Sequence, residues 1–235
     1  MKIRSFIIAY ALVLAILLFA DRRPNSTQQD RYSHVVDLTD GPSTTAPRAK
    51  ALESRTRIIA PDTLIPGTWA AGQIPPERLV APLVVMDLNV APEGAAQISL
   101  DDISTWESQH GVIPQGAVVA IRRTGARRVV SSNDLPTNDL STNDLSSTAT
   151  PFPIARDAAL FLMDARYTTG FALETQVNLT DDRTFARQLA LHGSYVVEGA
   201  ARFTSLPAAG SLVIVAPARN KKSGAAPVRI LAMVR

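Results

Sequence analysis

Side chains able to perform nucleophilic or metal chemistry are scarce in this chain of 235 residues, which has no cysteine and only three histidines. The lack of cysteine excludes disulfides, cysteine-ligated zinc, iron–sulfur clusters and a thiol nucleophile. No Gly-x-Ser-x-Gly elbow is present either. His110 and His192 each end a predicted helix, where an imidazolium complements the helix dipole, so we expect structural roles for them. His34 is expected at a solvated strand edge.

A short repeat places aspartates at regular spacing, in the segments NDLPT, NDLST and NDLSS. Asp134, Asp139 and Asp144 recur every five positions. Calcium loops instead place oxygen ligands at alternate positions around a glycine, and this segment contains no glycine. We interpret residues 131–150 as a low-complexity surface insertion rather than a calcium site.

The net charge of +3 is concentrated near the N-terminus. Residues 1–31 contain five basic and two acidic residues, so the remaining chain is neutral. No basic patch of the kind that binds nucleic acid is expected, and no nucleic-acid partner is predicted. The apolar content of 46% is sufficient for a sizeable core.

The N-terminus has the pattern of an export signal. Lys2 and Arg4 precede the apolar run Phe6–Ala20, which is typical of a signal peptide or signal anchor over residues 1–20. As a helix this run would span ~23 Å, less than the ~30 Å hydrocarbon core, which favours a cleaved signal peptide. Leu18 is a poor residue for cleavage, so an uncleaved anchor stays open. Residues 21–32 are expected to form a polar tether. Residues 33–235 are expected to form the domain, which is either exported (periplasmic or extracellular) or anchored to a membrane.

The rest of the chain predicts one α/β domain in which strands and helices mix without regular alternation. Helices are expected at 98–110, 155–165 and 183–192, and Ser99 with Asp102 forms a predicted N-terminal cap that precedes a stop at Gly111. Strands are expected at 34–39, 57–59, 82–90, 117–122, 171–177, 194–198, 212–216 and 228–234.

Six segments, in the same order, resemble the cyclase family of metal-dependent hydrolases, which includes the kynurenine formamidases (arylformamidases). They are LVAP running into VVMDL (79–88), ISLDDISTWESQHGVIPQGAVVAIRRTG (98–125), FPIARDAA (152–159), GFALETQVN (170–178), YVVEGAARFTSLPAAG (195–210) and AAPVRILA (225–232). The resemblance implies a cyclase-like swivelling β/β/α single domain with a mixed sheet, preceded here by the N-terminal hydrophobic helix. It also implies a homo-oligomer, either a dimer or a tetramer.

The family signature, HxGTHxDxPxH, binds zinc or manganese, and a later histidine and a glutamate complete the site. Such a metal polarises a substrate carbonyl and lowers the pKa of a bound water. In this chain the signature falls on residues 53–63, ESRTRIIAPDT. The positions of the metal and proton-transfer residues are taken by Glu53, Arg57, Ile59 and Thr63, the later histidine by Ala186, and Glu198 keeps the family's identity.

These replacements remove the chemistry of a metal site. Isoleucine and alanine have no lone pair to donate, and Arg57 is a permanent cation that repels a divalent ion. We therefore expect Arg57 to pair with Glu53 or Glu198 and to fill the former metal site. The alternative is a carboxylate-only site of Glu53, Asp62 and Glu198, which would favour magnesium, calcium or manganese. The candidate pocket is accordingly Glu53, Arg57, Asp62 and Glu198.

Two functional hypotheses follow. The first is an exported or anchored cyclase-fold protein without a metal cofactor, which acts as a non-catalytic binding or scaffold module for an unidentified small molecule. The second is a metal-dependent amide or ester hydrolase of the arylformamidase type, with a rebuilt ligand set and a substrate like N-formylkynurenine from tryptophan catabolism.

Overall fold

The computed structural model describes residues 32–40, 56–89, 97–124, 151–179, 182–219 and 224–235. Residues 1–31, Glu53 and the insertion at 131–150 lie outside these ranges, so the signal or anchor segment, most of the tether and the insertion stay predictions. Within the described ranges, none of the helices has the length and apolar character needed to cross a bilayer.

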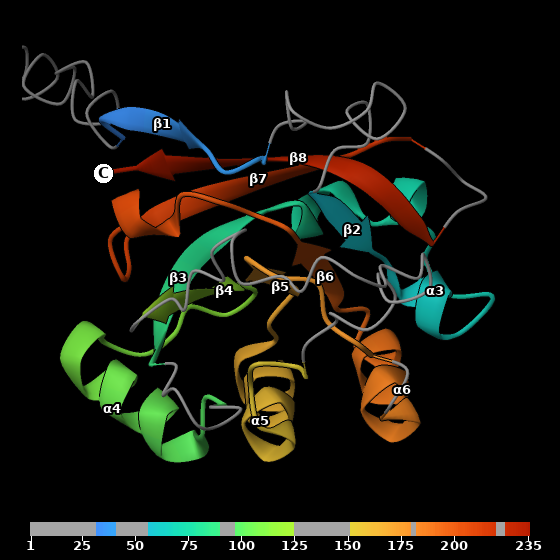
Figure 1. Ribbon diagram of the computed structural model, residues 1–235, viewed down its shortest axis with the longest axis horizontal. Helices are drawn as coiled ribbons and strands as arrows, with labels where there is room; N and C mark the ends of the chain where they lie inside the picture. The colour runs from blue at the N-terminus through green and yellow to red at the C-terminus, as the bar shows by residue number, and fades with distance from the viewer. Residues whose placement is uncertain (1–31, 41–55, 90–96, 125–150, 180–181, 220–223) are drawn as a thin grey trace, which may run out of the picture.

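Residues 80–198 form three consecutive strand–helix–strand units, whose strands lie parallel and in chain order. Figure 1 shows the three helices side by side along one face of the sheet. The strands are β3 (Val80–Asn89), β4 (Val118–Thr124), β5 (Gly170–Leu173) and β6 (Tyr195–Glu198), and the helices are α4 (Leu100–His110), α5 (Arg156–Arg166) and α6 (Arg183–Leu191).

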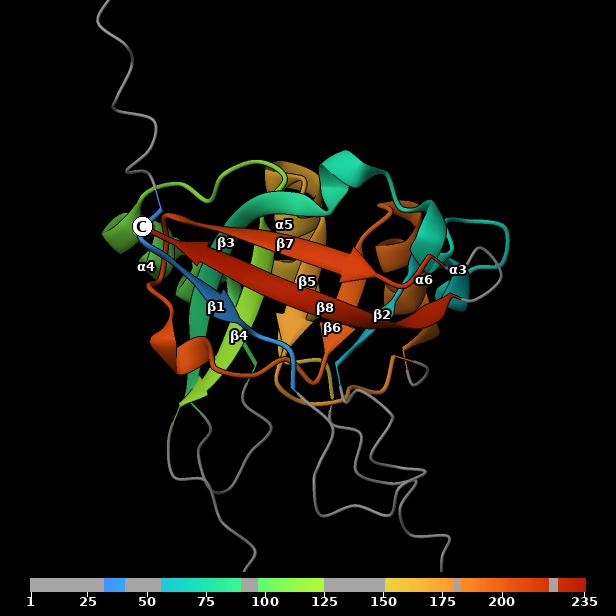
Figure 2. The same cartoon turned by 90° about the horizontal axis from the view of Figure 1, so that it is seen from above.

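Antiparallel strands close this sheet into a ring. β7 (Ser211–Pro217) pairs with β3, β8 (Ala225–Val234) pairs with β7, and β2 (Arg57–Ile59) lies between β8 and β6. The result is a barrel of seven strands, and β1 (His34–Asp37) adds to β8 outside the ring. Figure 2 shows β1 and β8 crossing over the parallel strands. Short segments complete the fold: α3 (Pro61–Leu64), η2 (Ala71–Gln73), η3 (Pro76–Arg78) and η5 (Phe203–Ser205).

Two hydrophobic cores follow from the alternation of side chains along the strands. On β8, Val228, Ile230 and Ala232 are buried inside the barrel, whereas Pro227 and Arg229 face outward. The second core lies between the sheet and the helices, with Leu162 of α5 among its fully buried members. The outer face of the parallel strands is therefore covered by helices, as the inner face is covered by the rest of the barrel.

Helix α4 begins and ends as its sequence predicts. The Ser99 hydroxyl accepts from the Asp102 N–H at 3.2 Å, and the Asp102 carboxylate accepts from the Ser99 N–H at 2.8 Å. The Ser99 hydroxyl also donates to the Asp102 carboxylate at 2.7 Å, and this bond together with the one from the Ser99 N–H holds the pKa of Asp102 below its ordinary value. Gly111 ends the helix with a φ of 87°, a conformation that suits glycine. The indole N–H of Trp106 donates to the Val85 carbonyl at 3.0 Å and ties the helix to β3.

The mixed α/β class is confirmed, and two predictions need correction. Strands and helices do alternate regularly between Val80 and Glu198, and the irregularity comes from the antiparallel strands before and after this stretch. The strand expected at 171–177 ends at Leu173, because the chain then leaves the sheet and places the Val177 N–H on the Glu198 carboxylate at 2.9 Å.

Gly170 of β5 faces the ring of Tyr195 on β6. A methyl group at Gly170 would overlap with the Tyr195 ring, which is fully buried and is held by a 2.9 Å hydrogen bond from its hydroxyl to the Arg78 carbonyl. We predict that G170A lowers the free energy of unfolding by about 2 kcal/mol, measured by denaturant titration. In a Y195V background the same substitution should cost clearly less. An equal cost in both backgrounds would contradict this account of the close approach.

Candidate functional site

The candidate site is centred on Glu198, where the register of the sheet places it opposite Arg57. β2 and β6 are antiparallel, and Arg57 and Glu198 are directly opposed in them. Ile59, two residues further along β2, is opposite Val196. Because side chains of one strand alternate between faces, these four lie on the helix-facing side of the sheet. Ile58 and Val197 point into the barrel instead.

Both oxygens of the Glu198 carboxylate are engaged. One accepts from the Arg57 Nε at 2.7 Å, and the other accepts from the Val177 N–H at 2.9 Å. The side chain of Glu198 has no exposed surface, whereas that of Arg57 is 45% exposed. A fully buried carboxylate is costly unless it is paired and hydrogen-bonded, and these two contacts meet that requirement.

The backbone around this pair is held by Thr56, which is completely buried. Its hydroxyl donates to the Gly199 carbonyl at 2.7 Å and accepts from the Asp40 N–H at 2.7 Å. Gly199 has a φ of 65°, so the chain turns sharply directly after Glu198. These hydrogen bonds link the segment after β1 to the start of β2 and the end of β6, and so they fix the backbone position of Glu198.

The other singled-out residues that the structure describes have contacts of their own. Ile59 is buried in the core beneath the helices, and Ala186 is 93% buried on α6. Asp62 accepts a hydrogen bond from the Gly67 N–H at 2.8 Å, and Thr63 lies against Gly224. The structure therefore brings together Arg57 and Glu198, whereas Asp62 stabilises the local turn that leads to Gly67.

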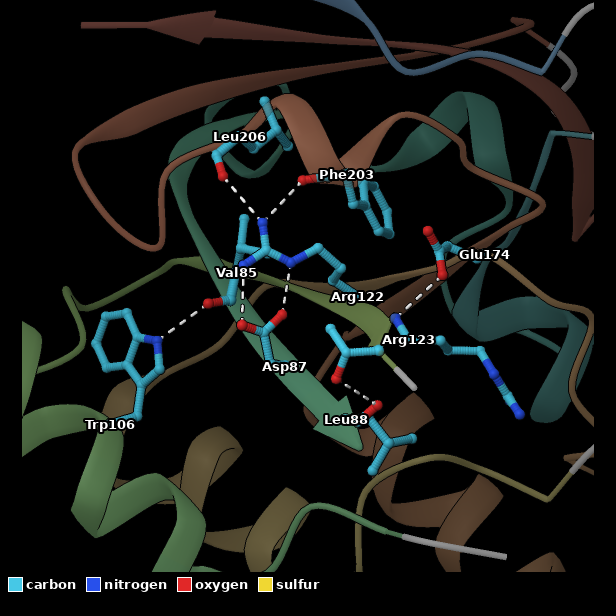
Figure 3. Close-up of polar contacts among 10 residues, drawn as sticks. Val85, Asp87, Leu88, Trp106, Arg122, Arg123, Glu174, Phe203 and Leu206 are labelled. Carbon is cyan, nitrogen blue, oxygen red and sulfur yellow. Dashed lines mark hydrogen bonds and ion pairs between the residues drawn. The ribbon is translucent and has the colours of Figure 1, made fainter. Parts of the chain in front are cut away.

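A second polar cluster lies near the carboxyl ends of the same parallel strands, and no signal in the sequence indicated it. Arg122 of β4 donates from Nε and Nη2 to the two oxygens of Asp87 on β3, the latter at 2.9 Å (Figure 3). Its Nη1 donates to the carbonyls of Phe203 and Leu206 at 3.2 and 3.1 Å. Arg122 thus fixes η5 to the carboxyl-terminal part of β3 and β4. Beside it, Glu174 accepts from the Arg123 N–H at 3.1 Å.

The histidines have structural partners, as expected for two of them. His192 follows α6 and contacts the Gln188 carbonyl through Nδ1 at 2.8 Å and Asp164 of α5 through Nε2 at 2.7 Å. His110 packs on the Trp106 ring. The exposed side chain of His34 has one hydrogen-bond partner among the described residues, the Ser33 hydroxyl at 2.9 Å. Helix packing brings Asp164 and His192 together, a contact that no local pattern in the sequence indicates.

Comparisons with known proteins define the class. The model of the family described as "Putative cyclase" matches residues 25–177, which is more than half of the chain, so the chain belongs to the cyclase family. A comparison with curated proteins finds no match.

Solved structures share the fold. Isatin hydrolase A from Labrenzia aggregata, bound to benzyl benzoate, has a TM-score of 0.62 at 23% identity, over 86% of this chain and 93% of that chain. Isatin hydrolase A from Ralstonia solanacearum has a TM-score of 0.62 at 20% identity, over 86% and 92%. A potential metal-dependent hydrolase with cyclase activity has a TM-score of 0.57 at 22% identity, over 86% and 98%.

The residues present do not fit the zinc or manganese ion that the resemblance to the family implies. Where the resemblance places ligands, this chain has the cation Arg57 and the apolar Ile59 and Ala186, none of which donates an electron pair to a metal. Glu198 already uses both oxygens. Within the described ranges, no three acidic or histidine side chains gather closely enough to hold an ion. The carboxylate-only alternative requires Glu53, which lies outside those ranges, so it stays a prediction.

Removing the guanidinium should leave a buried carboxylate without its counter-charge. We predict that R57A lowers the free energy of unfolding by about 2 kcal/mol, a value reduced from the fully buried case because Arg57 is partly exposed. The double variant R57A/E198Q should recover part of this loss, since the amide oxygen can still accept from Val177. R187A, at an exposed arginine of α6, is the control. An R57A protein as stable as wild type would refute the pairing.

The Arg122–Asp87 pair predicts a defined pH dependence. Hydrogen bonding from Arg122 holds the pKa of Asp87 below its ordinary value, against the opposing effect of burial. Its stabilisation, about 1 kcal/mol for this half-exposed carboxylate, is present above the unfolded pKa near 4 and is lost as pH falls through the folded pKa. The difference in unfolding free energy between wild type and D87N should therefore shrink below about pH 4. A difference that grows at low pH would contradict the assignment.

Proposed function

We propose that this chain is a non-hydrolytic member of the cyclase family that acts as a binding or scaffold module. The observation that carries the proposal is the 2.7 Å ion pair between Arg57 and the fully buried Glu198. It stands at the position where the resemblance places the metal. The pair supplies a positive charge and a satisfied carboxylate, and so it preserves the shape of the site without a Lewis acid.

The chemistry of the replacement supports this reading. A guanidinium stays protonated at every physiological pH, so it cannot act as a general base or take the role of a metal-bound hydroxide. To admit a divalent ion, Arg57 would have to leave Glu198. Of the signature positions that the structure describes, the ion would then find the carboxylate of Glu198 beside Ile59 and Ala186. A metal site requires several donors in a fixed geometry. The site therefore supports binding rather than hydrolysis.

The location and assembly of the module rest on the sequence alone. The apolar run Phe6–Ala20 behind Lys2 and Arg4 is the basis for an exported or membrane-anchored protein. Homodimers or homotetramers are expected from the resemblance to the family. Both belong to the proposal, and neither is needed for the argument about Arg57.

The competing function is metal-dependent hydrolysis with a rebuilt ligand set. Purified protein, equilibrated with zinc or manganese and then desalted, should contain far less than one ion per chain by plasma mass spectrometry. It should also fail to hydrolyse isatin, the substrate in the names of the similar structures, and N-formylkynurenine. A stoichiometric metal together with turnover of either compound would replace this proposal by the hydrolase.

The single variant R57H tests whether one residue accounts for the loss. It removes the cation and introduces an imidazole at that position. We expect no metal retention and no hydrolysis, because Ile59, Thr63 and Ala186 still provide no complete ligand set. Activity restored by R57H alone would show that the signature has been aligned to the wrong residues.

A further inference from the structure

A separate groove opens where β1, the end of β7 and the start of β8 meet the segment after β6. It has a volume of about 600 Å³, within the range of small-molecule sites. Its charged residues are Asp37, Arg202 and Arg229, and much of the remaining wall consists of alanine, proline and valine. It is therefore an open, largely apolar surface with charge gathered at one place.

Two arginines converge on one aspartate in this groove. The Asp37 carboxylate accepts from the Thr39 N–H at 3.0 Å and from Arg229 Nη2 at 3.1 Å. Arg202 does not use the carboxylate, because its Nη1 donates to the Asp37 backbone carbonyl at 3.2 Å. The cluster thus has two cations against one anion. Although burial opposes it, hydrogen bonding from Thr39 and Arg229 holds the pKa of Asp37 below its ordinary value.

Within the part of the chain that the structure describes, most N–H donors of these two arginines have no hydrogen-bond partner. A guanidinium carries five N–H donors in a planar fork. The side chains of Arg202 and Arg229 each make one hydrogen bond to another described residue, and in both cases that residue is Asp37. Arg229 is 66% exposed, so its remaining donors can reach a ligand without displacing a protein group.

The backbone at Arg202 is a second, independent sign of a specialised position. Arg202 has a φ of 62° and a ψ of 25°, a left-handed conformation that costs a residue with a side chain about 1 kcal/mol. Its neighbours hold it there, since the Ala201 N–H donates to the Leu38 carbonyl at 2.8 Å and Ser205 donates to the Arg202 carbonyl at 2.8 Å. Strain of this kind is retained where the surroundings over-determine it, often at binding sites.

We propose that this groove binds a small organic acid, with its carboxylate between Arg202 and Arg229 and its apolar part on the walls formed by β7 and β8. Paired guanidinium groups are suited to planar carboxylates, and the net charge of +1 matches a single one. Asp37 acts as the internal counter-ion that orients Arg229. This site is distinct from the Arg57–Glu198 pair, and its existence does not depend on whether the chain is an enzyme.

Phenylacetate tests the proposal, with phenylacetamide as its neutral counterpart and inorganic phosphate as an anion without an apolar part. Titrated into the isotope-labelled full-length chain, phenylacetate should saturably shift the backbone amide resonances of Arg202, Ala218 and Arg229. Phenylacetamide should bind at least fivefold more weakly. Equal binding of the acid and the amide, or binding of phosphate but not of phenylacetate, would overturn the assignment.

Two variants locate the binding to these arginines. R202G removes the guanidinium and suits the left-handed backbone, so the fold should be retained. R229Q removes the second cation. Each should weaken phenylacetate binding about tenfold, as expected for the loss of a charge-assisted contact. R187A should bind as wild type. Unchanged affinity in the R202G/R229Q double variant would exclude this groove, and because Arg57 is intact in every variant, the result is separable from the fate of the metal site.

Discussion

The site depends on how a buried carboxylate is satisfied. Glu198 is completely enclosed, and a charge in such a position must have hydrogen bonds and a counter-charge or it destabilises the fold. The chain supplies one partner from the backbone, at Val177, and one from a side chain, at Arg57. In a metalloprotein the counter-charge for such a carboxylate would be the ion. In this chain the positive charge that faces Glu198 belongs to a side chain of the protein itself, Arg57 of β2.

The closed sheet is what brings Arg57 and Glu198 together. Arg57 and Glu198 are 141 residues apart in sequence, and they meet because β2 fills the gap between β6 and β8. β2 is only three residues long, so its register is set by its neighbours: Ile58 must enter the barrel and Ile59 must enter the core beneath the helices. A shift by one residue would bury Arg57 inside the barrel, and the alternation therefore keeps the guanidinium facing Glu198.

Local signals in the sequence predicted most helices and strands. They could not predict which strands pair or which side chains of different elements meet. The cap formed by Ser99 and Asp102 and the stop at Gly111 depend on neighbouring residues, so helix α4 could be predicted almost to its ends. The closure of the sheet could not, because no local pattern states which strands pair. For the same reason the Arg122–Asp87 ion pair and the Asp164–His192 contact were missed: each joins two elements that only packing brings together.

The site could be predicted in part. The partner of Arg57 could be narrowed to Glu53 or Glu198, because the family resemblance placed these residues around one site. The hydrogen bond from the Val177 N–H had no side-chain signal at all.

An inherited fold does not by itself retain the inherited reaction. The family match and the shared architecture concern how strands and helices are arranged, whereas hydrolysis depends on a few donor atoms. Anomalous X-ray diffraction from crystals grown with zinc or manganese tests this most directly. We predict no anomalous peak within about 2.5 Å of the Glu198 carboxylate. The electron density should instead show the Arg57 guanidinium hydrogen-bonded to a carboxylate oxygen of Glu198. A peak bound to Glu198, with Arg57 turned away, would contradict the account.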